Sequence, residues 1–229
     1  MKFRILVLLS VLLPFLVSAE EKQSAFRSLN ADDGLTHNAV LAILQDRMGF
    51  MWFGTKDGLN RYDGTEIRII AVEDAIPGNN YITTLCEDGD GCIWMGTDAG
   101  VCIYDPGTER AHRFLERSDD GSTISGNIAN IVMAPDSTIW ICGGNQGFFR
   151  YDPAIRKLTH IITDKTGTRT YTARNICFTP QGIACIALDD GNIYLSEDGL
   201  ESVAPLFSGD ATEAFRDLFI NRLVSGTFN

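Results

Sequence analysis

The segment 38–63 recurs three more times along this chain. Residues 80–105 and 127–152 are clear copies, and residues 174–196 are a weaker copy. The copies share a central Trp, replaced by Ala184 in the fourth copy, and a Tyr near the end. These landmarks are Trp52, Trp94 and Trp140, which lie 42 and 46 residues apart, and Tyr62, Tyr104, Tyr151 and Tyr194. A fixed period of this length predicts a repeat architecture.

Each copy has the pattern of four short strands separated by turns. In the first copy, residues 39–45, 50–55, 59–62 and 65–72 are apolar or alternating, and glycine-containing turns separate them. Four antiparallel strands with an aromatic and glycine signature, repeated at this spacing, predict a β-propeller blade. We therefore expect an all-β propeller of four-stranded antiparallel blades, with about four complete blades, a partial fifth and an incomplete ring. The expected blades cover residues 36–75, 78–118, 125–165, 172–208 and, in part, 212–229, and a strand at 25–30 is expected to complete the last blade.

The aromatic and glycine landmarks are expected to serve packing. Large side chains such as Trp52 and Tyr62 fill the space between neighbouring blades. Gly54 and Gly96 follow the first two Trp residues by two positions and would let adjacent strands approach closely.

The first nineteen residues have the pattern of a secretory signal peptide. Lys2 and Arg4 precede an apolar run from Ile5 to Val17, and a small-residue site ends at Ala19. An uncleaved membrane anchor is the alternative, although the run is short for a span. No later stretch is apolar for long enough to cross a membrane, so we expect residues 20–229 to be a periplasmic propeller without a membrane span.

The net charge and the positions of the cysteines restrict the kinds of partner and cofactor that we expect. The net charge is −11 and no block of Lys and Arg occurs, which argues against nucleic acid and anionic membranes. The six cysteines stand at different positions in each copy and are interpreted as small apolar fillers rather than a disulfide framework. They form no zinc-ligand spacing with His37, His112 and His160, so we expect no metal and no cofactor.

The repeat resembles the two-component regulator propeller repeat. The first copy carries the resemblance in Gly34-Leu35, Trp52, Gly54-Thr55 and the run from Gly58 to Gly64, and the later copies match more loosely. In that family, propellers form the periplasmic sensor region of hybrid two-component histidine kinases of Bacteroides-type bacteria. The resemblance implies a sensor of glycan breakdown products. Because the kinase is not found in this sequence, we expect a short or truncated form without kinase activity of its own.

The candidate ligand-binding residues lie in loops that enter each inner strand or join the second and third strands. Amides, carboxylates and one aromatic ring suit a small-molecule or oligosaccharide ligand, although each residue also suits a solvated loop. The candidates are His37, Asn38, Lys56, Asp57, Asn80, Tyr81, Asp98, Asn127, Asn145, Gln146 and Asp189.

No motif for catalysis is found, and no catalytic residue is predicted. The carboxylates lie mostly in turns, where an Asp side chain accepts hydrogen bonds from backbone N–H groups of the same turn. Two alternatives to a sensor remain open. One is a propeller enzyme, either a lyase or a glycoside hydrolase with two converging carboxylates. The other is an interaction scaffold that pairs with another propeller or with missing C-terminal blades.

Overall fold

The computed structural model describes residues 28–74, 80–162 and 171–206. The expected signal peptide (1–19) and the partial fifth blade (212–229) lie outside these residues. Within the described ranges, no helix is long and apolar enough to cross a membrane. Of the expected strand 25–30, residues 28–30 are described and are irregular. Asn30 caps a short 3-10 helix, Ala31–Asp33, through a capping box.

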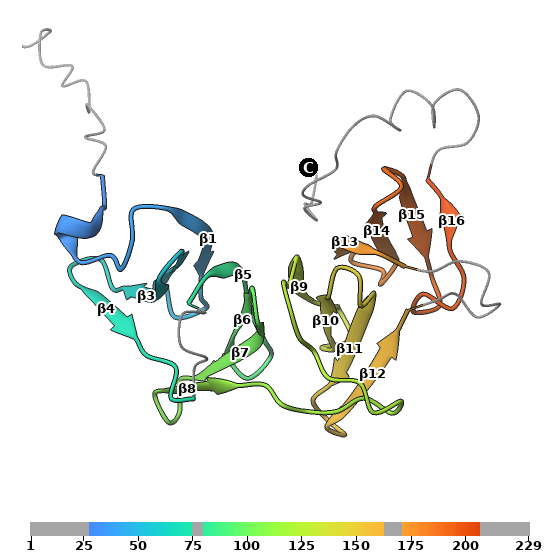
Figure 1. Ribbon diagram of the computed structural model, residues 1–229, viewed down its shortest axis with the longest axis horizontal. Coiled ribbons are helices and arrows are strands. Elements are labelled where there is room, and N and C mark those ends of the chain that lie inside the picture. Colours follow the sequence, from blue (N-terminus) through green and yellow to red (C-terminus); the bar gives the residue numbers. More distant parts are fainter. Residues whose placement is uncertain (1–27, 75–79, 163–170, 207–229) are drawn as a thin grey trace, which may run out of the picture.

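The described residues form four antiparallel sheets of four strands each, and each sheet is one predicted blade (Figure 1). Within every sheet the strands pair in the order of the sequence, which is the meander that the repeat predicted. Blade one is β1 (Val40–Gln45), β2 (Met51–Thr55), β3 (Gly58–Tyr62) and β4 (Ile67–Ile70); blade two is β5 (Ile82–Glu87), β6 (Ile93–Thr97), β7 (Gly100–Asp105) and β8 (Arg110–Arg113); blade three is β9 (Asn130–Met133), β10 (Ile139–Cys142), β11 (Phe148–Asp152) and β12 (Lys157–Ile161); blade four is β13 (Ala173–Phe178), β14 (Ala184–Leu188), β15 (Ile193–Ser196) and β16 (Ala204–Pro205).

The four blades follow one another in an open arc (Figure 1). The first strands of the blades, β1, β5, β9 and β13, lie on the inside of the arc, and each contacts the next. Blade one and blade four stand at its two ends, so the described sheets do not close into a ring. The expected incomplete propeller is therefore what the structure shows.

A hydrogen-bonded turn anchors the Trp of each of the first three blades. Asp46 directly follows β1, and its carboxylate accepts the backbone N–H of Phe50 at 2.9 Å and the indole N–H of Trp52 at 2.8 Å. Asp88 does the same in blade two, where the indole of Trp94 donates at 2.7 Å. In blade three the hydroxyl of Thr138 accepts from the third indole, that of Trp140, at 3.1 Å. Each buried indole thus has a partner, which a buried donor needs.

Each anchored Trp packs against an aromatic residue of the next blade. The ring centroids of Trp52 and Tyr104 are 5.0 Å apart, and those of Trp94 and Tyr151 are 5.6 Å apart. Trp140 instead packs against Phe178 of blade four, also at 5.6 Å. These contacts are within the usual range for aromatic pairs. The cores therefore lie between the blades, as expected for the Trp residues and for Tyr104 and Tyr151, whereas Tyr62 of blade one is only partly buried.

A glycine on the second strand of one blade and the residue that faces it on the next blade set the distance between the two blades. A Cβ added at Gly54 would lie 2.5 Å from Cγ2 of Ile82, at the start of the next blade's inner strand. A Cβ at Gly96 would lie 2.8 Å from Cγ2 of Ile128 and 2.5 Å from a methyl carbon of its own blade. In the third blade the glycine becomes Cys142, and the facing position becomes the small residue Ala173 in the same buried cluster. The size of one residue thus compensates for the size of the other.

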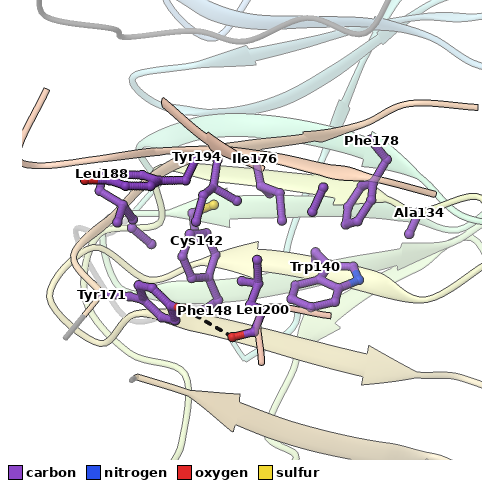
Figure 2. Packing of buried hydrophobic residues seen from close by; sticks show 13 residues of the cluster. Ala134, Trp140, Cys142, Phe148, Tyr171, Ile176, Phe178, Leu188, Tyr194 and Leu200 are labelled. Atoms are coloured by element: carbon purple, nitrogen blue, oxygen red, sulfur yellow. Dashed lines mark hydrogen bonds between the residues drawn. The ribbon is translucent and has the colours of Figure 1, made fainter. Parts of the chain in front are cut away.

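The interface between blades three and four is a compact apolar cluster (Figure 2). Trp140 and Phe148 of blade three meet Ile176 and Phe178 of blade four. Tyr171 closes one side, and its hydroxyl donates a hydrogen bond of 3.1 Å to the carbonyl oxygen of Leu200. This interface is built without a Trp from blade four.

The structure corrects the alignment of the fourth repeat. In blades one to three the Trp lies six positions after the turn residue, whose N–H donates to the carbonyl four positions further on; these turn residues are Asp46, Asp88 and Ala134. The equivalent bond in blade four runs from the N–H of Thr179 to the carbonyl of Ile183. Cys185, not Ala184, therefore occupies the Trp position. In blades one to three the conserved Tyr pairs with the residue before the Trp, and in blade four the residue at that place is Ser196, which pairs with Ala184. Tyr194 pairs with Ile186 instead and therefore lies two positions earlier. Alternate residues of a strand share a face, and Tyr194 is still buried in the interface with blade three.

Candidate functional site

The loops that join the second and third strands of blades one and two share one construction. In blade one, the hydroxyl of Thr55 donates to the carbonyl of Gly58 at 3.1 Å and accepts the N–H of Asp57 at 3.0 Å. Thr97 repeats both bonds with Gly100 and Ala99 in blade two. Both glycines have a φ of +122°, which favours glycine. The Gly-Thr motif thus fixes two similar loops on one face of neighbouring blades.

A cavity of about 270 Å³ lies between these two blades. Its wall is mostly apolar, and the polar groups stand among the loop residues and on β8. This volume is just below the roughly 300–1,000 Å³ typical of ligand pockets. The apolar wall includes Leu59, Ile70, Ile82, Met95 and Val101, and the polar lining includes Asp57, Asn80, Thr97 and Arg113.

Two predicted residues, Asp57 and Asn80, meet at this cavity. The side-chain amide of Asn80 donates to a carboxylate oxygen of Asp57 at 3.2 Å, and both residues are exposed. Arg113 is partly buried and brings a cation to the same cavity. A carboxylate, an amide and a guanidinium next to an apolar wall can bind a ligand that has both hydroxyl groups and a flat apolar face.

The other predicted residues of the loop face do not join this cavity. Lys56, Asp98, Asn127 and Asn145 are exposed on separate loops, and Tyr81 is partly buried. His37 and Asn38 are also exposed, and their side chains accept backbone N–H groups, at 2.8 Å from Ala39 and 2.7 Å from Ala31. These two side chains shape the entry to β1.

Gln146 and Asp189 have partners within the chain. The amide of Gln146 accepts the N–H of Ser125 at 3.0 Å and donates to the carbonyl of Thr123 at 3.1 Å. It thereby ties the loop of blade three to the segment that enters it. Asp189 forms an ion pair with Arg174. Both ends of the Gln146 amide therefore stabilise a loop.

Sequence reasoning missed two groups of polar residues. Arg113 lies at the end of a fourth strand, outside the loops that were considered. A polar row also crosses the inner strands, where Asn130 donates to Asn175 at 2.8 Å and Thr84 contacts Asn130 at 3.4 Å. Thr84, Asn130 and Asn175 share one repeat position, because each lies four positions before the turn residue of its blade. That recurrence is a signal that could have found them.

Local hydrogen bonds lower the pKa values of two carboxylates that lie in turns. Backbone N–H groups of Glu66 and Thr65 lower the pKa of Asp63 to about 2. Hydrogen bonds from Ser202 lower the pKa of Asp198 to about 2 as well. Both shifts arise within a single turn, which indicates a structural role. In the described parts of the chain, no three His, Cys, Asp or Glu side chains come together as metal ligands would.

Comparison with known proteins identifies the repeat. The model of the two-component regulator propeller matches residues 34–57 and 76–99. A histidine kinase P4 of Formosa agariphila is 38% identical over 63 residues, which are 28% of this chain and 5% of the kinase. This chain thus spans a small part of that relative.

Solved extracellular domains have the same architecture. One, from a putative hybrid two-component system of B. thetaiotaomicron, superposes with a TM-score of 0.67 at 25% identity, over 79% of this chain and 26% of that one. A second from the same organism gives 0.61 at 19% identity, over 74% and 25%, and shows the fold alone. The chain corresponds to about a quarter of each of these domains. It carries the two-component regulator propeller repeat, in the fold of the extracellular domains of putative hybrid two-component systems.

Proposed function

We propose that this chain is an exported, periplasmic sensing propeller that binds a glycan-derived ligand at the cavity between blades one and two. The observation that carries the proposal is the meeting of Asp57 and Asn80 at an apolar cavity, on the loop face where propellers bind. Sugars offer hydroxyl groups to such polar side chains and a flat carbon face to the apolar wall. The similarity to extracellular domains of two-component systems supports export and sensing. The partner of this chain would then be further propeller blades, which pack against the open ends of the arc and complete the ring.

Isothermal titration calorimetry of the full chain against a panel of oligosaccharides tests the proposal. Loss of one ligand hydrogen bond costs about 1–1.5 kcal/mol, so Asp57→Ala and Asn80→Ala should each weaken binding roughly tenfold. Asp98→Ala is the matched control, because Asp98 is an exposed loop carboxylate of blade two that does not line the cavity. Equal losses in all three variants, or no binding by any oligosaccharide, would contradict the proposed site.

A further inference from the structure

Two cysteines lie directly opposite each other in blade four. Cys177 of β13 and Cys185 of β14 are register partners in the antiparallel pairing. Side chains of such partners point to the same face of the sheet, with Cβ atoms about 4.5–5.5 Å apart and Cα atoms within about 5.5 Å. Disulfides span Cα separations of about 4.4–6.8 Å, which this pair meets, and Cβ separations of about 3.5–4.5 Å, so the two Cβ atoms must approach each other slightly when the bond forms. The two thiols are close enough to shift each other's pKa.

Their position in the repeat is occupied differently in the other blades. Cys185 takes the place of the anchored Trp, and Cys177 takes the place of the residue opposite that Trp. The equivalent pairs are Leu44 with Trp52, Cys86 with Trp94, and Val132 with Trp140. Blade four therefore has two thiols where the first three blades use a large ring to hold the first two strands and the next blade together.

The pKa of Cys177 is shifted in the opposite direction from the pKa values of Cys86 and Cys102. The neighbouring thiol of Cys185 lowers the pKa of Cys177 and so favours its thiolate, whereas the same interaction raises the pKa of Cys185 well above its ordinary value. Burial raises the pKa of Cys86 to about 12 and that of Cys102 to about 11. A thiolate is the species that attacks a disulfide. Both members of the pair are only partly buried, whereas Cys142 is fully buried.

We propose that Cys177 and Cys185 form a disulfide that links β13 to β14. The thiolate of Cys177 attacks one sulfur of an oxidising disulfide, such as glutathione disulfide or the disulfide of a thiol oxidoreductase, and releases the first thiol. Cys185 then loses its proton and attacks the sulfur of Cys177, which expels the second thiol. The chain gives up two protons and two electrons, and the oxidant is reduced to two thiols. The disulfide holds together the first two strands of the blade that lacks the Trp.

Peptide mass mapping of the full chain tests the linkage. The chain is incubated with glutathione disulfide, denatured, alkylated and digested with trypsin. The sequence has no Lys or Arg between Arg174 and Arg216, so both cysteines fall in one peptide that contains no other cysteine. We expect this peptide to be unalkylated and lighter than its reduced form by the mass of two hydrogens. Because the oxidant is supplied in the assay, the result does not depend on the proposed ligand or on export.

With the corrected register of blade four, Cys86 and Cys177 share one repeat position, contrary to the expectation that the cysteines stand at different positions in each copy. Cys86 is therefore the internal control, because it faces Trp94 instead of a cysteine. We expect Cys86 to be alkylated in every sample, and Cys177→Ser to make Cys185 accessible to the alkylating reagent. The proposal is overturned if Cys177 and Cys185 are alkylated as fully as Cys86 after oxidation. A disulfide from either of them to another cysteine would also overturn it.

Discussion

The contact between Gly54 and Ile82 gives a sharp test of how the blades pack. In Gly54→Ala, the new Cβ would lie 2.5 Å from Cγ2 of Ile82 and 3.1 Å from its Cβ. Favourable carbon contacts begin at about 3.5 Å, so roughly 1 Å of overlap must be relieved. Ile82 is 3% exposed and has little room to move. We expect the substitution to lower the free energy of unfolding by about 1–3 kcal/mol, the usual cost of overpacking.

The measurement is equilibrium unfolding in urea, followed by Trp fluorescence. Gly89→Ala is the matched control, because a Cβ there would meet no atom within 4 Å and the backbone φ is not positive. It should leave the free energy of unfolding unchanged or raise it slightly, since Ala restricts the unfolded chain.

A double variant isolates the contact itself. Ile82→Ala removes Cγ2 and is expected to cost about 2–5 kcal/mol by leaving a cavity. In that background, Gly54→Ala should cost about 1–2 kcal/mol less than it does in the natural chain, because its main obstacle is gone. If Gly54→Ala is no more destabilising than Gly89→Ala, or if the two changes simply add, the packing argument is wrong.

Three further predictions follow from the hydrogen bonds. Asp88→Ala removes the acceptor of the Trp94 indole and of two turn N–H groups, and it should lower the free energy of unfolding by about 1–3 kcal/mol in urea, whereas exposed Asp90→Ala should not. Tyr104→Phe should be neutral or raise the melting temperature, because the buried hydroxyl has no partner among the described residues, whereas Tyr171→Phe should lower it by removing the bond to Leu200. Asp63 and Asp198 have native pKa values of about 2 against an ordinary 3.8, so their stabilisation is present above pH 4 and is lost as the pH falls from 4 to 2. The urea midpoint should fall less steeply over that window in Asp63→Asn/Asp198→Asn, and an unchanged slope would contradict the assignment.

The sequence by itself determined the blades. Their turns depend on residues a few positions apart, such as Asp46 with Phe50 and Trp52, and this local dependence repeats with the period. The alternation of apolar residues sets the faces of each strand, because successive side chains point to opposite sides. A four-stranded meander could therefore be predicted from the order of residues, and so could its likeness to the two-component regulator propeller.

Only the tertiary structure decided the register of blade four and the grouping of the site. The place of Cys185 depends on which residues close the turn after β13, and an alignment guided by Tyr194 misses it by one position. Likewise Asp57 and Asn80 are 23 residues apart, and they meet at one cavity with Arg113 because blade two stacks on blade one at a distance set by Gly54. Contacts between blades join residues distant in sequence, and no local pattern records them.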